Sequence, residues 1–227
     1  MKKLFKSIFS KQKTSELRSL DDPRNLARGD MIVLKEDYGL PTMLRGKEFQ
    51  VSHVGTYQFQ YRHYSECTLK GDGPSIFLSI DEIDGEEMAN FSLKIEREQV
   101  EQLFDMDEFA DIFAVASPND AETNEGETGS AILHLKNTPT TLSGWVSDLY
   151  RQQDFGERGY YYDRSFGSMG PPKTKGQGEP FEYYSLLSDD ERYGIEIEVW
   201  EDGATDVFLS LYRPMTDIVE LFPAHKD

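Results

Sequence analysis

The chain has 227 residues, 37% of them hydrophobic and 12% aromatic, which is enough to bury a core in one domain or two small ones. A formal net charge of −18 disfavours nucleic acid as a direct partner, because phosphate binding needs clustered Lys and Arg. One cysteine, Cys67, excludes an intrachain disulfide, and the apolar runs are far shorter than the ~20 residues that cross a bilayer. These features favour a cytoplasmic protein.

Residues 1–22 are predicted to form a basic N-terminal segment. Residues 1–13 carry five Lys and no acidic residue, whereas the remainder of the chain carries a net charge of −23. Met1, Leu4, Phe5, Ile8 and Phe9 have the spacing of one helical stripe. Such a helix can lie on an anionic membrane surface. The candidate membrane-contact residues are Lys2, Lys3, Leu4, Phe5, Lys6, Ile8 and Phe9. The alternatives are a solvated terminus and docking on the protein's own acidic body.

Residues 23–116 are predicted to form a first β-meander-plus-helix unit, which begins at the Asp21-Asp22-Pro23 boundary. Alternating or apolar runs predict strands near residues 31–34, 48–51, 56–61, 76–80 and 91–95. Asp84-Gly85 predicts the turn of a hairpin. The apolar spacing from Val100 to Phe113 then predicts a helix in one or two pieces.

Residues 117–130 have the composition of an acidic linker, and residues 131–227 are predicted to form a second β-meander-plus-helix unit. Within it, residues 131–135 read as a strand, 141–151 as a helix and 153–180 as a long irregular segment. Alternation predicts strands on both sides of Asp202-Gly203. Arg213-Pro214 then predicts a helix whose apolar stripe is Ile218, Leu221 and Phe222.

The two units resemble one another in spacing. Asp84-Gly85 precedes Leu103-Phe104 by the same interval at which Asp202-Gly203 precedes Leu221-Phe222, and Ser92-Leu93 falls opposite Ser210-Leu211. Two explanations stay open, namely an internal duplication and a chance likeness between ordinary hairpins. The predicted fold class is α+β, mainly β, with two related antiparallel meander-plus-helix units.

No set of residues predicts a catalytic centre, a metal site or a cofactor. His63 and Cys67 would share a strand face, but no activating group is visible, so a buried Cys67 is favoured. The acidic residues around Asp84-Gly85 fail the spacing of a calcium loop and favour a solvated hairpin tip. Phosphate-binding motifs are absent from the sequence.

An aromatic run between glycines is the second candidate site. Tyr offers a large contact area with few rotatable bonds, so this run is predicted to bind a protein partner, with packing over the sheet as the alternative. The candidate partner-binding residues are Tyr160, Tyr161, Tyr162, Arg164 and Phe166.

The first half resembles a bacterial domain family of unknown function. The matching stretches are Leu26-Ala27-Arg28-Gly29-Asp30, the strand Gly46 to Val51, the strand Tyr64 to Leu69, and Ile76 to Ile80, with Phe77-Leu78 in place of a Trp-Leu pair. Members of that family are often encoded beside proteins similar to phage-shock protein A, so the resemblance implies a membrane-stress setting. It implies no catalytic residues.

The sequence therefore favours a non-catalytic binding or adaptor protein, cytoplasmic and peripheral to the inner membrane, with a protein partner. One alternative is a hydrolase that uses carboxylates or His63 with Cys67. Another is an acidic decoy for a nucleic-acid-binding protein, which would capture a basic partner in a salt-sensitive manner.

Overall fold

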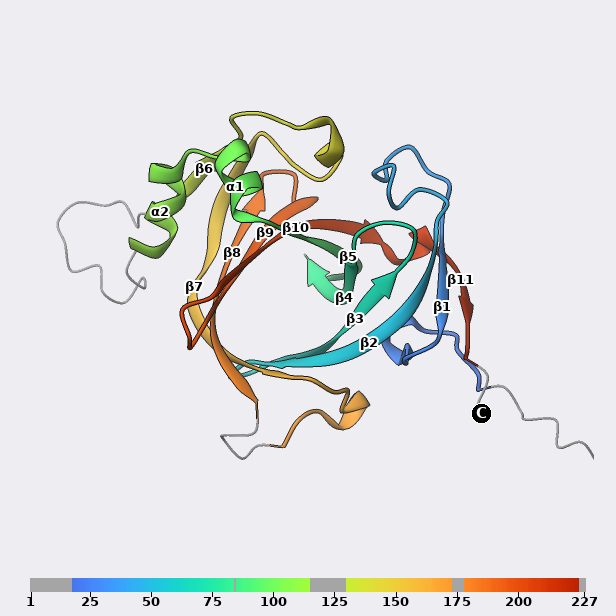
Figure 1. Cartoon of the computed structure of the whole chain (residues 1–227). Coiled ribbons are helices and arrows are strands. Elements are labelled where there is room, and N and C mark those ends of the chain that lie inside the picture. The colour runs from blue at the N-terminus through green and yellow to red at the C-terminus, as the bar shows by residue number, and fades with distance from the viewer. Residues whose placement is uncertain (1–17, 84, 115–129, 173–177, 225–227) are drawn as a thin grey trace, which may run out of the picture.

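The computed structural model describes residues 18–83, 85–114, 130–172 and 178–224 (Figure 1). Its strands are β1 (Met31–Leu34), β2 (Glu48–Gln58), β3 (His63–Lys70), β4 (Ile76–Ile83), β5 (Glu86–Ile95), β6 (Ile132–His134), β7 (Leu149–Tyr162), β8 (Glu179–Ser188), β9 (Tyr193–Trp200), β10 (Thr205–Pro214) and β11 (Ile218–Phe222). The α-helices are α1 (Arg97–Leu103) and α2 (Met106–Ala114). The chain is therefore mainly β, as the sequence predicts.

The strands form one antiparallel 11-stranded sheet in the order β11-β1-β2-β3-β4-β5-β10-β9-β8-β7-β6. A further pairing joins β2 to β7, with Thr56 opposite Tyr162 and Gln58 opposite Tyr160. This pairing closes the strands from β2 to β7 into a ring of eight (Figure 1). Closure pairs both edges of every ring strand over part of its length.

The two faces of the ring strands differ in chemistry. On β9, Ile195 and Ile197 alternate with Glu196 and Glu198, since successive side chains of a strand point to opposite faces. The aliphatic face contributes to the main hydrophobic core, which also takes side chains from β1, α1 and α2. Residues of the other face, from β3, β4, β8, β9 and β10, line one cavity, so this face points into the ring.

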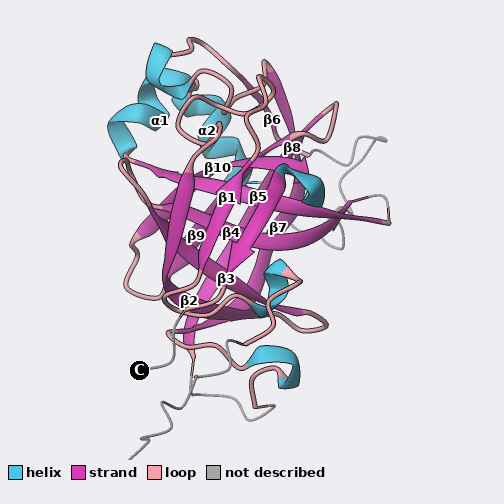
Figure 2. Ribbon diagram, turned by 90° about the vertical axis from the view of Figure 1, so that its right-hand side faces the viewer, coloured by secondary structure: helices cyan, strands magenta, loops and turns pink. Residues whose placement is uncertain are grey.

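The helices cover the aliphatic face near β6 and β7. α1 begins with a capping box between Glu96 and Gln99 and buries Val100 and Leu103. Phe113 at the end of α2 packs edge-on against Tyr184 of β8, with ring centroids 5.1 Å apart. Figures 1 and 2 both show α1, α2 and β6 side by side. The helix predicted in one or two pieces between Val100 and Phe113 is confirmed, and it has two pieces, α1 and α2.

The two Asp-Gly hairpins are also confirmed. Gly85 and Gly203 have φ of 80° and 86°, which is backbone that L side chains rarely adopt. The hairpins β4–β5 and β9–β10 lie side by side, because β5 pairs with β10 with Ser92 opposite Ser210. Internal duplication stays a prediction.

Three sequence predictions about local structure are wrong. Residues 141–151 are not a helix, because Thr140–Leu142 forms a 3₁₀ turn and β7 begins at Leu149. The segment 153–180 is not irregular throughout, since β7 continues to Tyr162. Past Pro214 the chain forms a 3₁₀ turn, Met215–Asp217, and then β11 instead of a helix. In each case strand pairing overrides the local signal, which is apolar spacing for the two helices and Gly and Pro content for the irregular segment.

The ring takes four neighbouring strands from residues 23–116, namely β2–β5, and four from residues 131–227, namely β7–β10, so the two predicted units share one sheet. Residues 1–17 and 115–129 lie outside the described residues, and with them the predicted amphipathic helix and all of the acidic linker except Ser130. Leu20 belongs to the main core, and Arg18 forms an ion pair with buried Asp30.

None of the helices that the structure describes is long and apolar enough to cross a membrane.

Candidate functional site

The interior of the ring brings together carboxyl groups that are far apart in the sequence. Glu66 lies on β3, Asp81 on β4, and Glu196 and Glu198 on β9. The Coulombic influence of Glu196, Glu198 and Asp81 on Glu66 places all four within one electrostatic neighbourhood. The approach of Glu66 to Glu196 and Glu198 requires the closed sheet, because three strands separate β3 from β9 in either direction around the ring.

Neutral donors hold two of these carboxyl groups in place. The side-chain amide of Asn90 on β5 donates hydrogen bonds to Asp81 Oδ2 at 3.0 Å and to Glu196 Oε1 at 2.8 Å. The Ser210 hydroxyl donates to the same Glu196 oxygen at 2.6 Å, and Ser79 to Asp81 Oδ2 at 3.2 Å. The network therefore joins β4, β5, β9 and β10.

Burial raises the pKa of every carboxyl group in this set. It raises the pKa of Glu66 well above the usual range, and repulsion from the neighbouring carboxylates adds to the effect. It raises the pKa of Glu198 to about 8, although a hydrogen bond from Tyr57 opposes the shift. The pKa values of Asp81 and Glu196 are also raised by burial, against the lowering effect of their hydrogen bonds.

Cations lie near the interior but are engaged elsewhere. Arg62 pairs with Glu157 at 2.9 Å and stacks over the Phe59 ring at 4.4 Å. Lys94 pairs with Asp206 at 2.6 Å. In the part of the chain that the structure describes, no basic side chain forms an ion pair with any of the four interior carboxyl groups, and Glu66 has no hydrogen-bonding partner. The interior is therefore acidic and without a direct ion pair, although the charge of Arg62 lowers the pKa of Asp81 and that of Lys94 lowers the pKa of Glu198.

Aromatic side chains fill the ring beside the carboxyl groups. Tyr57 stacks on Tyr64 with centroids 5.2 Å apart and meets Phe181 edge-on at 5.6 Å. Tyr161 packs over Gly55, where a Cβ atom would lie 2.6 Å from its ring. Burial raises the pKa of the Tyr57 and Tyr64 hydroxyls well above 10, so both stay protonated and able to donate hydrogen bonds.

A cavity of about 170 Å³ opens into this interior. The acidic residues Asp81, Glu82, Asp154 and Glu196 line it, together with the basic residue Arg62. The rings of three tyrosines complete the walls, namely Tyr64, Tyr183 and Tyr212. Convergent groups with raised pKa values in a cavity are a general mark of a functional site.

The predicted partner-binding residues are described, and among them Tyr161 packs in the ring interior while Tyr160 and Tyr162 lie on the other face of β7. Tyr161 belongs to the aromatic cluster, and Tyr162 is buried and donates a hydrogen bond to Gln58 at 2.8 Å. Arg164 lies over the Phe166 ring at 4.6 Å, and Arg164 is exposed. Partner binding by this run stays a prediction, as does membrane contact by residues 2–9, which lie outside the described residues.

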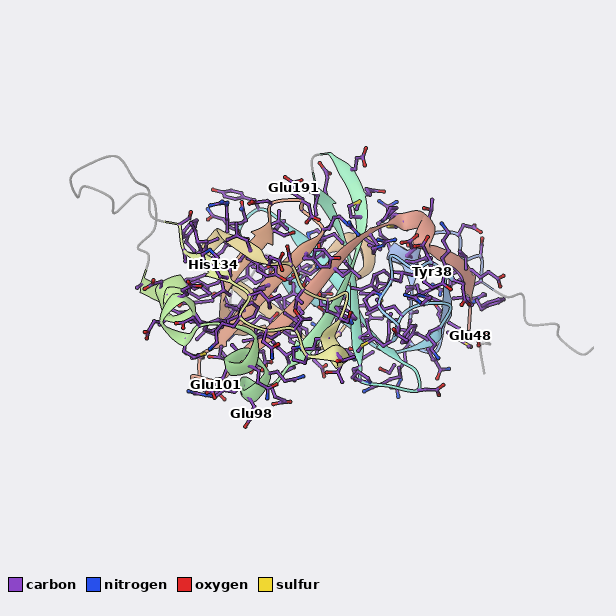
Figure 3. The ribbon with its side chains drawn as sticks, turned by 90° about the horizontal axis from the view of Figure 1, so that it is seen from above. Tyr38, Glu48, Glu98, Glu101, His134 and Glu191 are labelled. Carbon is purple, nitrogen blue, oxygen red and sulfur yellow. The ribbon has the colours of Figure 1, made fainter. Side chains whose placement is uncertain are left out.

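The other chemical candidates from the sequence lie apart from the interior carboxyl groups. Cys67 is buried on the aliphatic face, and burial raises its pKa to about 12, while His63 is exposed. His134 pairs with Glu108 at 3.1 Å, and Figure 3 shows it on the outside of the molecule, as are Glu98 and Glu101 of α1. Among the described side chains, no group of three or more His, Cys, Asp or Glu is placed to hold a metal ion.

Sequence reasoning missed Glu66, Glu196 and Glu198. It identified Asp81 only as part of a solvated hairpin tip, whereas the side chain points into the ring and its pKa is raised by burial. The pattern Ile195-Glu196-Ile197-Glu198 ordinarily indicates a strand with one solvated face. Only ring closure reveals that this polar face is enclosed.

Comparison with known proteins gives no further guide to this site. No family model matches the chain, and no curated protein or solved structure is detectably similar to it.

Proposed function

We propose that this chain is a non-catalytic binding protein whose ring interior takes a small, positively charged ligand that donates hydrogen bonds, such as an amine or a guanidinium. One observation carries the proposal. Asp81 and Glu196 are held near one another by the Asn90 amide, with raised pKa values and no cation paired to either in the described part of the chain. A bound cation would relieve the burial penalty of both carboxylates.

The cavity limits the size of the ligand. Its volume of about 170 Å³ is below the roughly 300–1,000 Å³ of sites for drug-sized molecules. A ligand of a few heavy atoms therefore fits best. Tyr64, Tyr183 and Tyr212 also line the cavity, and an aromatic ring attracts a cation more strongly than a neutral molecule of the same shape.

Non-catalytic binding is supported over the His63 and Cys67 version of the hydrolase alternative by the state of the thiol. With a pKa of about 12, Cys67 is protonated at neutral pH and is a poor nucleophile. Protons and cations would instead compete for the interior carboxyl groups. Cation binding should release protons, so affinity should rise with pH.

Thermal shift and calorimetry with butylamine and methylguanidine test the proposal, with butanol as the neutral analogue. We expect a saturable rise in Tm with both cations and none with butanol, and tighter binding at about pH 8.5 than at about pH 6. Glu196→Gln keeps the shape of the side chain and should abolish the effect. Glu101→Gln, on the exposed face of α1, is the control for general attraction to the acidic surface.

Equal stabilisation by butanol would contradict the proposal, as would cation binding that Glu196→Gln leaves intact. A loss of binding in Glu101→Gln as large as in Glu196→Gln would assign the effect to surface charge. Circular dichroism of each variant keeps a folding defect separate from a binding defect. The adaptor role expected from the sequence stays a separate prediction.

A further inference from the structure

A groove of about 540 Å³ runs between residues 20–24 and the segment from Met215 to Leu221, away from the ring cavity. Its apolar lining includes Ile218, Val219 and Leu221 of β11. Val219 is 49% exposed, and Phe222, at the end of the same strand, is 46% exposed. Among the described strands β11 pairs only with β1, so its other edge is open (Figure 1).

The rim of the groove is acidic. Asp21, Asp22, Glu87 and Glu220 line it, and Arg24 is the basic residue among its lining side chains. Arg24 is already engaged, since it pairs with both Asp22 and Glu87. Asp21 and Glu220 are left without a basic partner in the described part of the chain. The groove therefore fits an occupant that carries both apolar and basic side chains.

Residues 1–13 of the same chain have that composition. Their five Lys contrast with the acidic remainder of the chain, and Leu4, Phe5, Ile8 and Phe9 have the spacing of one apolar stripe. We propose that this segment binds its own chain in the groove beside β11, with the apolar stripe on Ile218, Val219 and Leu221 and the lysines toward Asp21, Glu87 and Glu220.

Residues 1–13 can reach the groove, because the described chain begins beside it. Arg18 is fixed by Asp30 and by a hydrogen bond to the Asn25 carbonyl at 2.6 Å, and Leu20 itself lines the groove. Phe9 is nine residues from Arg18, a span of at most roughly 30 Å in extended chain. Tethering at this range raises the effective concentration to about the millimolar level. A second copy has no such advantage and also carries a net charge of −18.

Carbodiimide cross-linking of the full chain tests the proposal, because it joins a lysine amine directly to a contacting carboxyl group. A mixture of ¹⁴N- and ¹⁵N-labelled protein distinguishes links within a chain from links between chains. We expect links from residues 2–13 to Glu220, Asp21 or Glu87 within single chains. They should fall several-fold in Leu4→Ser/Phe5→Ser, which keeps every lysine, and in Val219→Ser.

Ile132→Ser is the matched control, since Ile132 is an exposed apolar residue on β6, the opposite edge of the sheet. It should leave the links unchanged. Links that spread over the acidic surface and survive Leu4→Ser/Phe5→Ser would overturn the proposal in favour of general charge attraction. Links found only between unlike isotopes would assign the groove to a second copy, and an absence of links would also overturn it.

Discussion

Asn90 and Glu196 are joined by a hydrogen bond of 2.8 Å although β10 lies between their strands, β5 and β9. The same amide nitrogen of Asn90 also donates to Asp81 at 3.0 Å. A neutral side chain thus stands between two carboxyl groups whose pKa values are raised by burial. The amide lowers the free energy of both ionised carboxylates without adding a charge.

Replacing Asn90 by Leu should reveal this role through pH dependence. The variant removes both hydrogen bonds and should lower the free energy of unfolding by about 1–3 kcal/mol near neutral pH. The loss should shrink as the pH falls and Asp81 and Glu196 become protonated. Urea unfolding at a series of pH values from neutral to acidic measures it.

Gln152→Leu is the control for this experiment. Gln152 is also buried, but its amide donates to the carbonyl groups of Ile112 and Asp154, which do not titrate. Its loss of stability should be the same at each pH. A pH-independent loss in Asn90→Leu would contradict the assigned role of Asn90.

Glu198→Gln should stabilise the protein at alkaline pH. Glu198 is 5% exposed, and its pKa rises from 4.5 to about 8 on folding, so the native state binds its proton more tightly than the unfolded state does. Stability is therefore highest below about pH 4.5, falls as pH rises toward about 8, and is constant above that.

The upper limit of this effect is about 5 kcal/mol, because one pKa unit corresponds to about 1.4 kcal/mol. The Tm advantage of Glu198→Gln should thus be largest near about pH 9 and vanish near about pH 4. Glu101→Gln, on an exposed helix face, should show a small difference at every pH. An advantage for Glu198→Gln that grows on acidification would contradict the raised pKa.

Cys67 should resist thiol reagents in the native protein. With a pKa of about 12, roughly one thiol in ten thousand is ionised at about pH 8, and the side chain is buried. Labelling with Ellman's reagent should be slow in buffer and rapid in urea, so that its rate follows unfolding. Rapid native labelling would restore the hydrolase alternative that uses His63 with Cys67.

Gly203→Ala tests the hairpin that the sequence predicts from Asp202-Gly203. Its φ of 86° should make the substitution cost about 1–2 kcal/mol of unfolding free energy. Gly73→Ala is the control, because Gly73 lacks a positive φ and has open space around its Cβ position. It should change stability by less than about 0.5 kcal/mol. Equal effects of the two substitutions would show that φ at Gly203 does not matter.

Local sequence signals predicted the elements that depend on local chemistry. The Asp-Gly turns follow from the backbone freedom of glycine, and α2 follows from the spacing of Phe109, Ile112 and Phe113. The spacing of Leu142, Trp145 and Leu149 is equally helical, yet Leu149 begins β7, because pairing with β6 and β8 decides its conformation. Local periodicity carries no information about such pairing.

The candidate site depends on a long-range contact that closes the ring. The closing contact joins Tyr57 to Tyr161, which are more than a hundred residues apart in the sequence. Without that contact, Glu66 and Glu198 would each lie on the solvated face of an ordinary strand. The sequence shows which residues are polar, but burial, and with it the raised pKa of each carboxyl group, exists only once the ring is closed.

The proposed groove beside β11 and the membrane surface predicted from the sequence would compete for Leu4, Phe5, Ile8 and Phe9. Each lysine near an anionic leaflet contributes about 1 kcal/mol, so five lysines favour vesicles rich in anionic lipid over neutral ones. Val219→Ser weakens the groove and should therefore increase cosedimentation with anionic vesicles, whereas Ile132→Ser should not. Equal binding by Val219→Ser and the parent chain would show that the groove does not compete. If a chain without residues 1–13 binds as well as the parent, the membrane prediction is wrong.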